Sequence, residues 1–219
     1  GLLLWLASTR GAQDPLVKTQ AGPRVTRQGR AWTLAMVFGV ETGCYTVLLA
    51  WLAPFYLQKG WSAQQAGALL AGLTLCEVVA GLAVSFYASR WPDRRLPMIV
   101  CAAMGIAGFV CLFTAPVTLA WLAIALLGFG IGALFPLTLI LTMDHSSNSH
   151  RAGVLTAFVQ GVGYMIAAAM PSLAGAMRDR LGSFDMAWLM IAIVLALSML
   201  LIMRFSLAST KQFDRTFVL

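Results

Sequence analysis

Six long apolar stretches divide most of the chain, and short polar segments separate them. A hydrocarbon core about 30 Å thick needs about 20 helical residues to cross it. Whole stretches are apolar all round, without the polar face of a helix that borders water. We therefore predict six transmembrane helices, approximately at residues 31–57, 64–88, 97–114, 117–142, 153–176 and 186–207.

The breaks between these stretches contain residues that end or interrupt helices. Gly60, Pro92 and Pro116 lie in the first three breaks, and polar or charged runs occupy residues 144–151 and 178–185. Glycine and proline are the strongest local signals for turns. The pattern thus predicts short loops between antiparallel neighbouring helices.

Composition supports membrane burial. Hydrophobic residues make up 60% of the 219 positions and charged residues 11%, with a mean hydropathy of +0.83. Soluble domains carry roughly 25% charged residues. So few charges do not cover a water-facing surface, and the chain is predicted to be an all-α integral membrane protein rather than a soluble enzyme.

The formal net charge of +7 comes from basic residues in short loops, which form no patch or motif for nucleic acid. Cytoplasmic loops of membrane proteins retain Lys and Arg. One side of the predicted zigzag holds Lys59, Arg178 and Arg180. The other side, predicted to be cytoplasmic, holds Arg10, Lys18, Arg24, Arg27, Arg30, Arg90, Arg94, Arg95, Arg151, Arg204, Lys211 and Arg215.

The chain divides into four segments. Residues 1–8 are expected to end a preceding transmembrane helix, and residues 9–30 to form a polar cytoplasmic linker. Residues 31–207 form the six-helix transmembrane bundle, and residues 208–219 form a cytoplasmic tail. We expect an N-terminal part to be missing, although a shortened gene product would give the same pattern.

The six predicted helices form two triplets, and the third helix of each triplet has the fewest polar residues. Polar groups in lipid are costly and normally face a bundle interior or a wet cavity. Four helices are therefore predicted to line a cavity and two to support it. The polar residues at depth in those four helices are Glu41, Tyr45, Glu77, Thr138, Thr142, Gln160 and Tyr164.

Glu41 and Glu77 lie at similar predicted depths, roughly 15 Å from the cytoplasmic end of their helices. Burial and mutual repulsion would both favour the protonated form, a state suited to carrying a proton. Tyr45 and Tyr164 each lie four residues after Glu41 and Gln160, so each pair shares a helix face. We predict that these five residues form the substrate and proton pathway; the alternative is that they form structural hydrogen bonds between helices.

The glycine motifs are predicted to serve helix packing rather than ligand binding. Glycines at 39 and 43, 128 and 132, and 161 and 163 permit close helix approach. The Gly128-Phe-Gly-Ile-Gly132 motif lies within an apolar stretch, so it is not a nucleotide site.

The cysteines and histidines indicate no metal centre. All four cysteines lie in apolar stretches without paired spacing, which predicts free thiols. His145 and His150 lie with Asp144 in a Ser/Asn-rich loop, where solvated side chains are expected. No catalytic set, metal site or cofactor site is predicted, and the chain is not predicted to be an enzyme.

Several blocks resemble the cyanate transporter family of the major facilitator superfamily, a group that includes nitroimidazole exporters. The blocks are Arg30-Ala-Trp32 with Gly39, Leu49-Ala-Trp-Leu-Ala-Pro54, Ser62-Ala-Gln-Gln-Ala-Gly-Ala-Leu-Leu70, Gly128-Phe-Gly-Ile-Gly132, His150-Arg-Ala-Gly153 and Gln160-Gly-Val-Gly-Tyr-Met-Ile-Ala-Ala-Ala-Met-Pro171. The resemblance implies a twelve-helix fold of two six-helix bundles, of which this chain is the C-terminal half. It also implies a central cavity and alternating access.

The loop at residues 90–95 only partly resembles the superfamily signature, which weakens the cytoplasmic gate that the resemblance implies at Asp93 and Arg94. No Lys or Arg lies deep within a predicted helix, which favours a neutral, weakly basic or protonated solute. We expect a proton-coupled secondary transporter of a small solute in the bacterial inner membrane. Its expected partners are the solute, protons, the bilayer and the missing N-terminal half; the alternative is a non-transporting interaction subunit or an inactive truncated transporter.

Overall fold

The structure, a computed structural model, describes residues 25–87, 90–91, 93–205 and Phe213. This part of the chain consists of a short 3-10 turn, η1 (Val25–Arg27), followed by long helices. The helices are α2 (Gly29–Gln58), α3 (Ala63–Tyr87), α4 (Arg95–Thr114), α5 (Ala120–Met143), α6 (Ser149–Leu181) and α7 (Asp185–Ile202). All six are long and apolar enough to cross a membrane, which confirms the predicted all-α membrane architecture.

Three helix boundaries, in two helices, differ clearly from the prediction. α6 is longer at both ends than residues 153–176. It begins early because the Asn148 side chain accepts hydrogen bonds from the backbone N–H groups of His150 and Arg151, and it ends where Gly182 adopts φ +73°. α7 ends at Ile202 rather than at residue 207, and a turn follows. Of the linker predicted at residues 9–30, residues 25–27 form η1, and α2 already begins at Gly29. The rest of that linker and the predicted segments at 1–8 and 208–219 lie outside the described residues, apart from Phe213.

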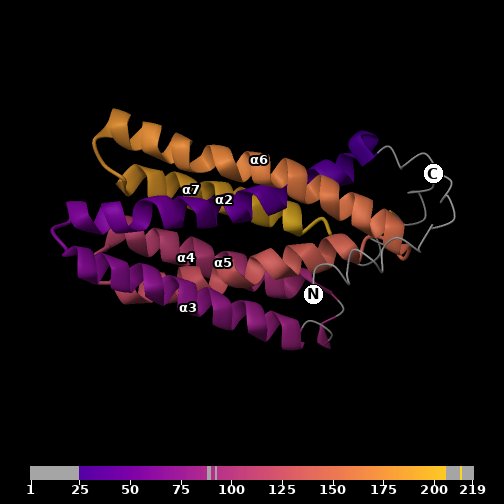
Figure 1. The fold of residues 1–219 in the computed structure, drawn as a ribbon, viewed down its shortest axis with the longest axis horizontal. Helices are drawn as coiled ribbons and strands as arrows, with labels where there is room; N and C mark the ends of the chain where they lie inside the picture. Colours follow the sequence, from indigo (N-terminus) through magenta and orange to yellow (C-terminus); the bar gives the residue numbers. More distant parts are fainter. Residues whose placement is uncertain (1–24, 88–89, 92, 206–212, 214–219) are drawn as a thin grey trace, which may run out of the picture.

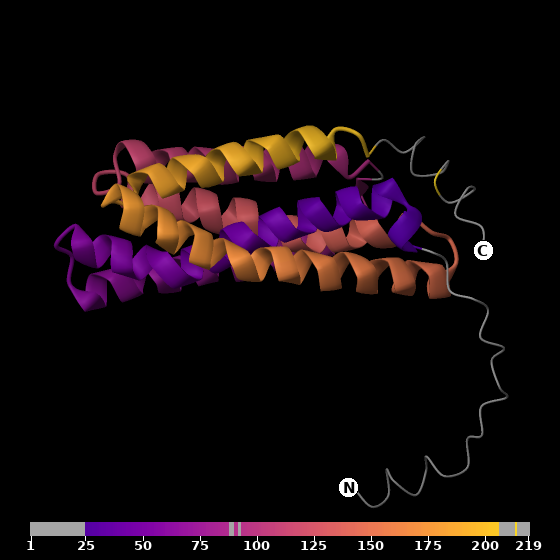
Figure 2. The same ribbon diagram turned by 90° about the horizontal axis from the view of Figure 1, so that it is seen from above.

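The helices form an elongated bundle in which the two triplets interlock (Figures 1 and 2). α2 packs along α6, while α5 packs along α3. The first helix of each triplet thus contacts the second helix of the other. The third helices, α4 and α7, pack against each other along one side of the bundle, as Figure 2 shows. This exchange is the arrangement expected of two three-helix units with opposite topology.

Glycines bring the helix backbones close together along α5. A Cβ atom on Gly132 would lie 2.5 Å from Cα of Glu77 in α3, and one on Gly128 would lie 2.8 Å from the Leu73 carbonyl oxygen. Gly130, on the other side of α5, faces the Cys101 carbonyl oxygen of α4 in the same way, at 2.6 Å. The glycines of this motif therefore serve helix packing between α3, α4 and α5.

The α2–α6 contact uses the other predicted glycines, with one exception. A Cβ on Gly39 would lie 2.9 Å from Cβ of Ile166, and one on Gly163 would collide with the Phe38 ring. Gly161 does not take part, because no atom lies within 4 Å of the position of its Cβ. The close helix approach predicted at Gly161 is therefore not made within this bundle.

Loops at the two ends of the bundle differ in charge. The loops α2–α3, α4–α5 and α6–α7 lie at one end, and the loops α3–α4 and α5–α6 lie at the other, beside the start of α2 (Figure 1). We call the second end the basic end. Its described basic residues are Arg27, Arg30, Arg90, Arg94, Arg95, Arg151 and Arg204, whereas the opposite end carries Lys59, Arg178 and Arg180.

Candidate functional site

A cavity of about 420 Å³, partly open to the outside of the bundle, is lined from four helices. None of its lining residues belongs to α4 or α7. The division into four cavity-lining helices and two supporting helices, predicted from the polar residues, is therefore found in the structure. The lining residues are Glu41, Thr42, Tyr45 and Thr46 of α2, Glu77 of α3, Ile131, Gly132 and Phe135 of α5, and Tyr164 of α6.

Glu41 is the most deeply buried charged residue of this cavity, with 2% of its surface exposed. Its Oε2 atom accepts a 2.5 Å hydrogen bond from the Thr138 hydroxyl of α5. Its Oε1 atom is buried and has no hydrogen-bond partner among the described residues. One side of the carboxyl group is thus fixed to α5, while the other retains an unused acceptor.

Glu77 reaches the same cavity from α3 across Gly132. The absence of a side chain on Gly132 leaves space for the Cα, Cβ and Cγ atoms of Glu77, which all lie within 3.0 Å of where a Cβ would be. The Oε1 atom of Glu77 is also buried without a hydrogen-bond partner in the described part of the chain. The structure therefore brings both sequence-predicted carboxylates to one cavity.

Aromatic side chains form one wall of the cavity. The rings of Phe135 and Tyr164 both contact Phe38, with centroids 5.5 and 5.3 Å from its ring. Tyr45 lines the same cavity as the two carboxylates, and Tyr164 is 47% exposed within this bundle. Both tyrosines predicted for the pathway thus reach the cavity.

Gln160 does not line this cavity. It lines a second cavity of about 490 Å³ with Met143, Thr156 and the serines of the α5–α6 loop. The four-residue spacing places Gln160 one helical turn closer to the basic end than Tyr164. The second cavity is therefore a polar space near the basic end, and it includes no carboxylate.

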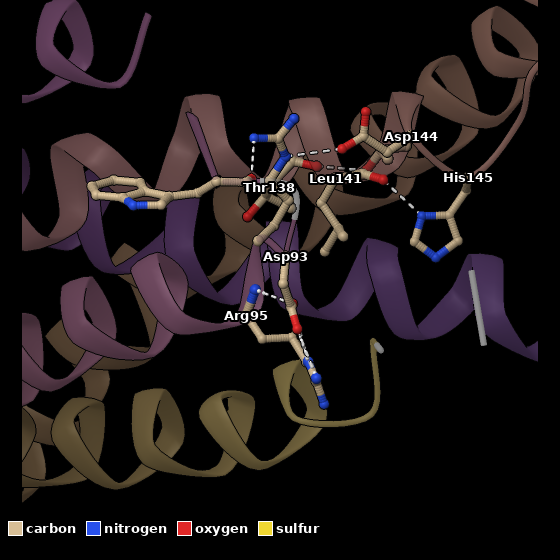
Figure 3. A network of polar contacts seen from close by, with 9 residues as sticks. Asp93, Arg95, Thr138, Leu141, Asp144 and His145 are labelled. Atoms are coloured by element: carbon tan, nitrogen blue, oxygen red, sulfur yellow. Dashed lines mark hydrogen bonds and ion pairs between the residues drawn. The ribbon is translucent and has the colours of Figure 1, made fainter. Parts of the chain in front are cut away.

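The basic end contains the two residues predicted to form a gate, but they do not pair with each other. Asp93 accepts hydrogen bonds from Arg95, with its Oδ2 atom 2.7 Å from Nη2. These hydrogen bonds lower the pKa of Asp93. Arg94 instead pairs with Asp144 at the end of α5, with 3.0 Å between Nε and Oδ2. Figure 3 shows the two acidic residues in this network.

His145 is a buried part of the same network, which sequence reasoning missed. The predicted solvated position is wrong, because none of its surface is exposed. Nε2 accepts a hydrogen bond from Nε of Arg30 at 2.9 Å. Nδ1 therefore carries the proton and donates to the Leu141 carbonyl oxygen at 2.6 Å, a bond that Figure 3 shows. The Phe205 and Phe213 rings contact the imidazole. Burial, together with the nearby positive charge of Arg30, lowers the pKa of His145 to about 4.

No sequence signal marks His145 as buried, because its partner Arg30 lies 115 residues away in the chain. All four cysteines are free thiols. The described residues contain no group of three or more His, Cys, Asp or Glu side chains arranged to hold a metal ion.

Comparison with known proteins identifies the family. The sequence profile described as Major Facilitator Superfamily matches residues 2–168, which is more than half of the chain. This chain belongs to the Major Facilitator Superfamily. Its six-helix bundle is half of the twelve-helix fold that the resemblance implied for the superfamily.

The relatives of this major facilitator chain include named transporters. The cyanate transport protein CynX of Escherichia coli (strain K12) is 38% identical over 190 residues, which cover 86% of this chain and 49% of that protein. The 2-nitroimidazole transporter of the same strain is 30% identical over 197 residues, which cover 88% of this chain and 50% of that protein. The chain therefore falls in the cyanate and nitroimidazole transporter family, and it spans about half the length of the curated relatives it matches.

Proposed function

We propose that this chain is the C-terminal half of a secondary active transporter that moves a small solute across the bacterial inner membrane by alternating access. The supporting observation is the cavity of about 420 Å³ that holds Glu41 and Glu77 inside a six-helix membrane bundle. Its volume lies in the range of small-molecule pockets. The family membership and the transporter names of the relatives support the same function.

Proton coupling through Glu41, assisted by Glu77, is the second part of the proposal. A carboxyl group in a low-dielectric site changes charge when it binds or releases a proton, so its state responds to the arrival of solute or water. The Thr138 hydroxyl can donate to either charge state of Glu41, while the unpartnered Oε1 atom is the position for the exchangeable proton. Charge and solute occupancy are thereby linked at one site.

The exposed faces of α3 and α6 support a second six-helix half as the partner of this chain. α3 carries a seam with heptad spacing in which every residue except Val78 is small, and all its residues lie at exposed or half-exposed positions: Gly67, Ala71, Thr74, Val78, Gly81 and Ser85. α6 carries Gly153, Ala157 and Gly161 at four-residue spacing, all exposed. No atom lies within 4 Å of a Cβ built on any glycine of these two seams. Small residues permit close contact between membrane helices, so these seams suit another helix bundle.

Substitution of exposed alanines by leucine tests whether α3 and α6 contact the proposed N-terminal half. Ala71→Leu in α3 and Ala157→Leu in α6 should each reduce co-purification with the proposed N-terminal half when both are expressed together. Ala107→Leu in α4 is the control, because Ala107 is also exposed but lies on the supporting side of the bundle. Equal co-purification of all three variants would contradict the proposed interface.

The charge difference between the two ends supports an orientation with the basic end in the cytoplasm. Cysteine labelling from either side of sealed vesicles tests it, with one reporter at Ser62 and one at Ser149 in a cysteine-free background. A reagent that does not cross the membrane should reach Ser149→Cys only in inverted vesicles. Reagent access to Ser149→Cys in right-side-out vesicles would overturn the orientation.

Flux in proteoliposomes tests the transport function. The complete protein, with both halves, should move a labelled solute from a panel that includes cyanate and 2-nitroimidazole when a pH gradient is imposed. Glu41→Gln should abolish the gradient-driven flux, whereas Asp179→Asn, which changes an exposed carboxylate outside the cavity, should not. Absence of flux for every solute in a folded complete protein would favour the alternative of a non-transporting interaction subunit.

A further inference from the structure

The chemical class of the solute follows from the groups that line the cavity of about 420 Å³. This inference rests on the proposed transport function. The lining contains two carboxyl groups and no Lys, Arg or His. All ion pairs within the described residues lie in loops or at helix ends, and none includes Glu41 or Glu77. The cavity therefore has acidic groups without a basic counterpart in this half of the transporter.

Three buried oxygen atoms around the cavity have no hydrogen-bond partner among the described residues. They are Oε1 of Glu41, Oε1 of Glu77 and the hydroxyl oxygen of Thr42. Buried polar atoms are rarely left unpaired in folded proteins, and an unpaired one needs an explanation. A ligand with N–H groups would supply the missing donors, whereas an anion without N–H or O–H groups has no donor to offer.

The aromatic wall of the cavity favours a solute that has a planar or cationic organic group. Phe135 and Tyr164 pack on Phe38, and the faces of such rings attract organic cations and cover planar apolar groups. A metal ion is a poor alternative, because hard cations need about six oxygen ligands. The part of the chain that the structure describes contains no metal-ligating cluster of three or more side chains.

We infer that the cavity binds a small planar organic base in its protonated form, such as an amidinium or an imidazolium, through N–H bonds to Oε1 of Glu41 and Oε1 of Glu77. The single positive charge balances one ionised carboxylate, that of Glu41, while Glu77 keeps its proton and accepts an N–H bond through its carbonyl oxygen. The N–H groups thus pair the unpaired oxygens, and the planar body lies against the aromatic wall. A cation that displaces a proton from Glu41 would also link solute binding to proton release. The cyanate named for one relative is an anion, so this chain is expected to differ from that relative in solute.

Four aromatic probes of similar size test this inference by direct binding. Benzamidine is a planar cation with N–H donors, benzyltrimethylammonium is a cation without them, benzamide is a neutral donor, and benzoate is an anion. Binding is measured by intrinsic tryptophan fluorescence and calorimetry in lipid nanodiscs at pH 7.5, using the 219-residue chain alone and together with the proposed N-terminal half. Benzamidine should bind at least about tenfold more tightly than each of the other three, as expected for hydrogen bonds to charged groups.

Variants connect the binding to the two carboxylates. Glu41→Gln and Glu77→Gln should each weaken benzamidine binding by about tenfold or more, whereas Asp179→Asn should leave it unchanged. If a variant does not fold, the relative affinities of the four probes for the unmodified protein still decide the outcome.

Each other outcome has a definite meaning. Preferred binding of benzoate would overturn the inference and indicate a cation supplied by the other half. Equal binding of benzyltrimethylammonium would overturn the role of the N–H bonds, and competition by Na⁺ at millimolar concentration would indicate a metal-ion site instead. Selective benzamidine binding without flux of any solute would contradict only the transport function, whereas flux without this selectivity would contradict only the solute class.

Discussion

The acidic groups in the cavity of about 420 Å³ and those at the basic end have opposite environments. At the basic end, Asp93 pairs with Arg95 and Asp144 pairs with Arg94. In the cavity, Glu41 and Glu77 are buried, and each has an oxygen atom with no partner in the described part of the chain. Burial of a charged group without a partner is unfavourable, so the cavity departs from the rules that stabilise the fold. The two regions differ because charges at the basic end are paired, and the Arg94–Asp144 pair links the start of α4 to the end of α5, whereas the cavity leaves a buried oxygen of each carboxyl group unpaired.

The largest predicted effect is a loss of folding stability at low pH, caused by His145 at the basic end. The pKa of His145 falls from 6.5 to about 4 on folding, so the unfolded chain binds more protons between these values and stability declines as pH falls through that window. The loss should approach about 3 kcal/mol near pH 4. A protonated Nε2 would oppose Arg30 with a second donor, and Asp144 compensates only in part.

Unfolding in mixed detergent micelles, followed by tryptophan fluorescence between pH 7 and 4, measures this effect. His145→Gln is the control, because an amide can still accept from Arg30 but does not titrate. The stability difference between the two proteins should therefore shrink as pH falls. Parallel pH curves for both would show that His145 is not the titrating group.

The second effect compares a closely packed glycine with an open one. Gly132→Ala places a methyl group 2.5 Å from Cα of Glu77, so α3 and α5 must move apart at a cost of about 1 to 3 kcal/mol. Gly161→Ala makes no contact within this bundle, and its better helix propensity should change stability by less than about 1 kcal/mol. Thermal unfolding of the chain in detergent compares the two variants. Equal melting temperatures would refute the close approach of α3 and α5 at Gly132.

The third effect concerns the hydrogen bond that holds Glu41. Thr138→Val keeps the shape of the side chain but leaves Oε2 of Glu41 without its donor, which should cost about 1 to 2 kcal/mol. Thr138→Ser keeps the hydroxyl and should lose less. If Glu41→Gln is introduced first, Thr138→Val should cost less than in the unmodified protein, because no carboxylate is left unpaired. Additive losses in this double-mutant cycle would argue against the Glu41–Thr138 bond.

The smallest effect is expected for the Arg94–Asp144 pair at the basic end. The side chain of Asp144 is 42% exposed, and exposed pairs contribute about 0.2 to 1 kcal/mol. Asp144→Asn should therefore lower stability by less than about 1 kcal/mol, with a smaller difference in high salt. The measurement is the melting temperature at low and high ionic strength. A loss of several kcal/mol would contradict the small contribution expected of an exposed ion pair.

Helix number and cavity-lining helices were predictable because lipid imposes a simple rule along the chain. A helix must be apolar over about 20 residues to span the hydrocarbon core, and polar residues at depth must face inward. Glu41, Tyr45, Glu77 and Tyr164 follow that rule, and all four line the cavity. Gln160 was predicted for the same pathway as a polar residue at depth that shares a helix face with Tyr164, but in the structure it lines the space near the basic end.

The position of an aromatic residue along its helix does not by itself predict whether its ring contacts lipid or protein. Tyr56 and Trp188 lie near the ends of their helices, where rings commonly anchor a protein at the membrane surface. Both are nevertheless fully buried: Tyr56 donates a 2.8 Å hydrogen bond to the Pro116 carbonyl oxygen, and Trp188 packs against Phe55 and Phe109. Distance along the helix determined their depth, but the neighbouring helices determined whether they met lipid or protein.

The sequence by itself determined that this protein is a membrane-embedded helical bundle, because hydropathy and helix length are local properties that lipid selects directly. It also determined which residues lie at depth, since each residue adds about 1.5 Å along a helix. Only the tertiary structure decided which side chains meet. The Glu41–Thr138 bond joins residues 97 positions apart, and the Arg30–His145 bond joins residues 115 positions apart. Such partners depend on the rotation and crossing of packed helices, which no local pattern of residues specifies.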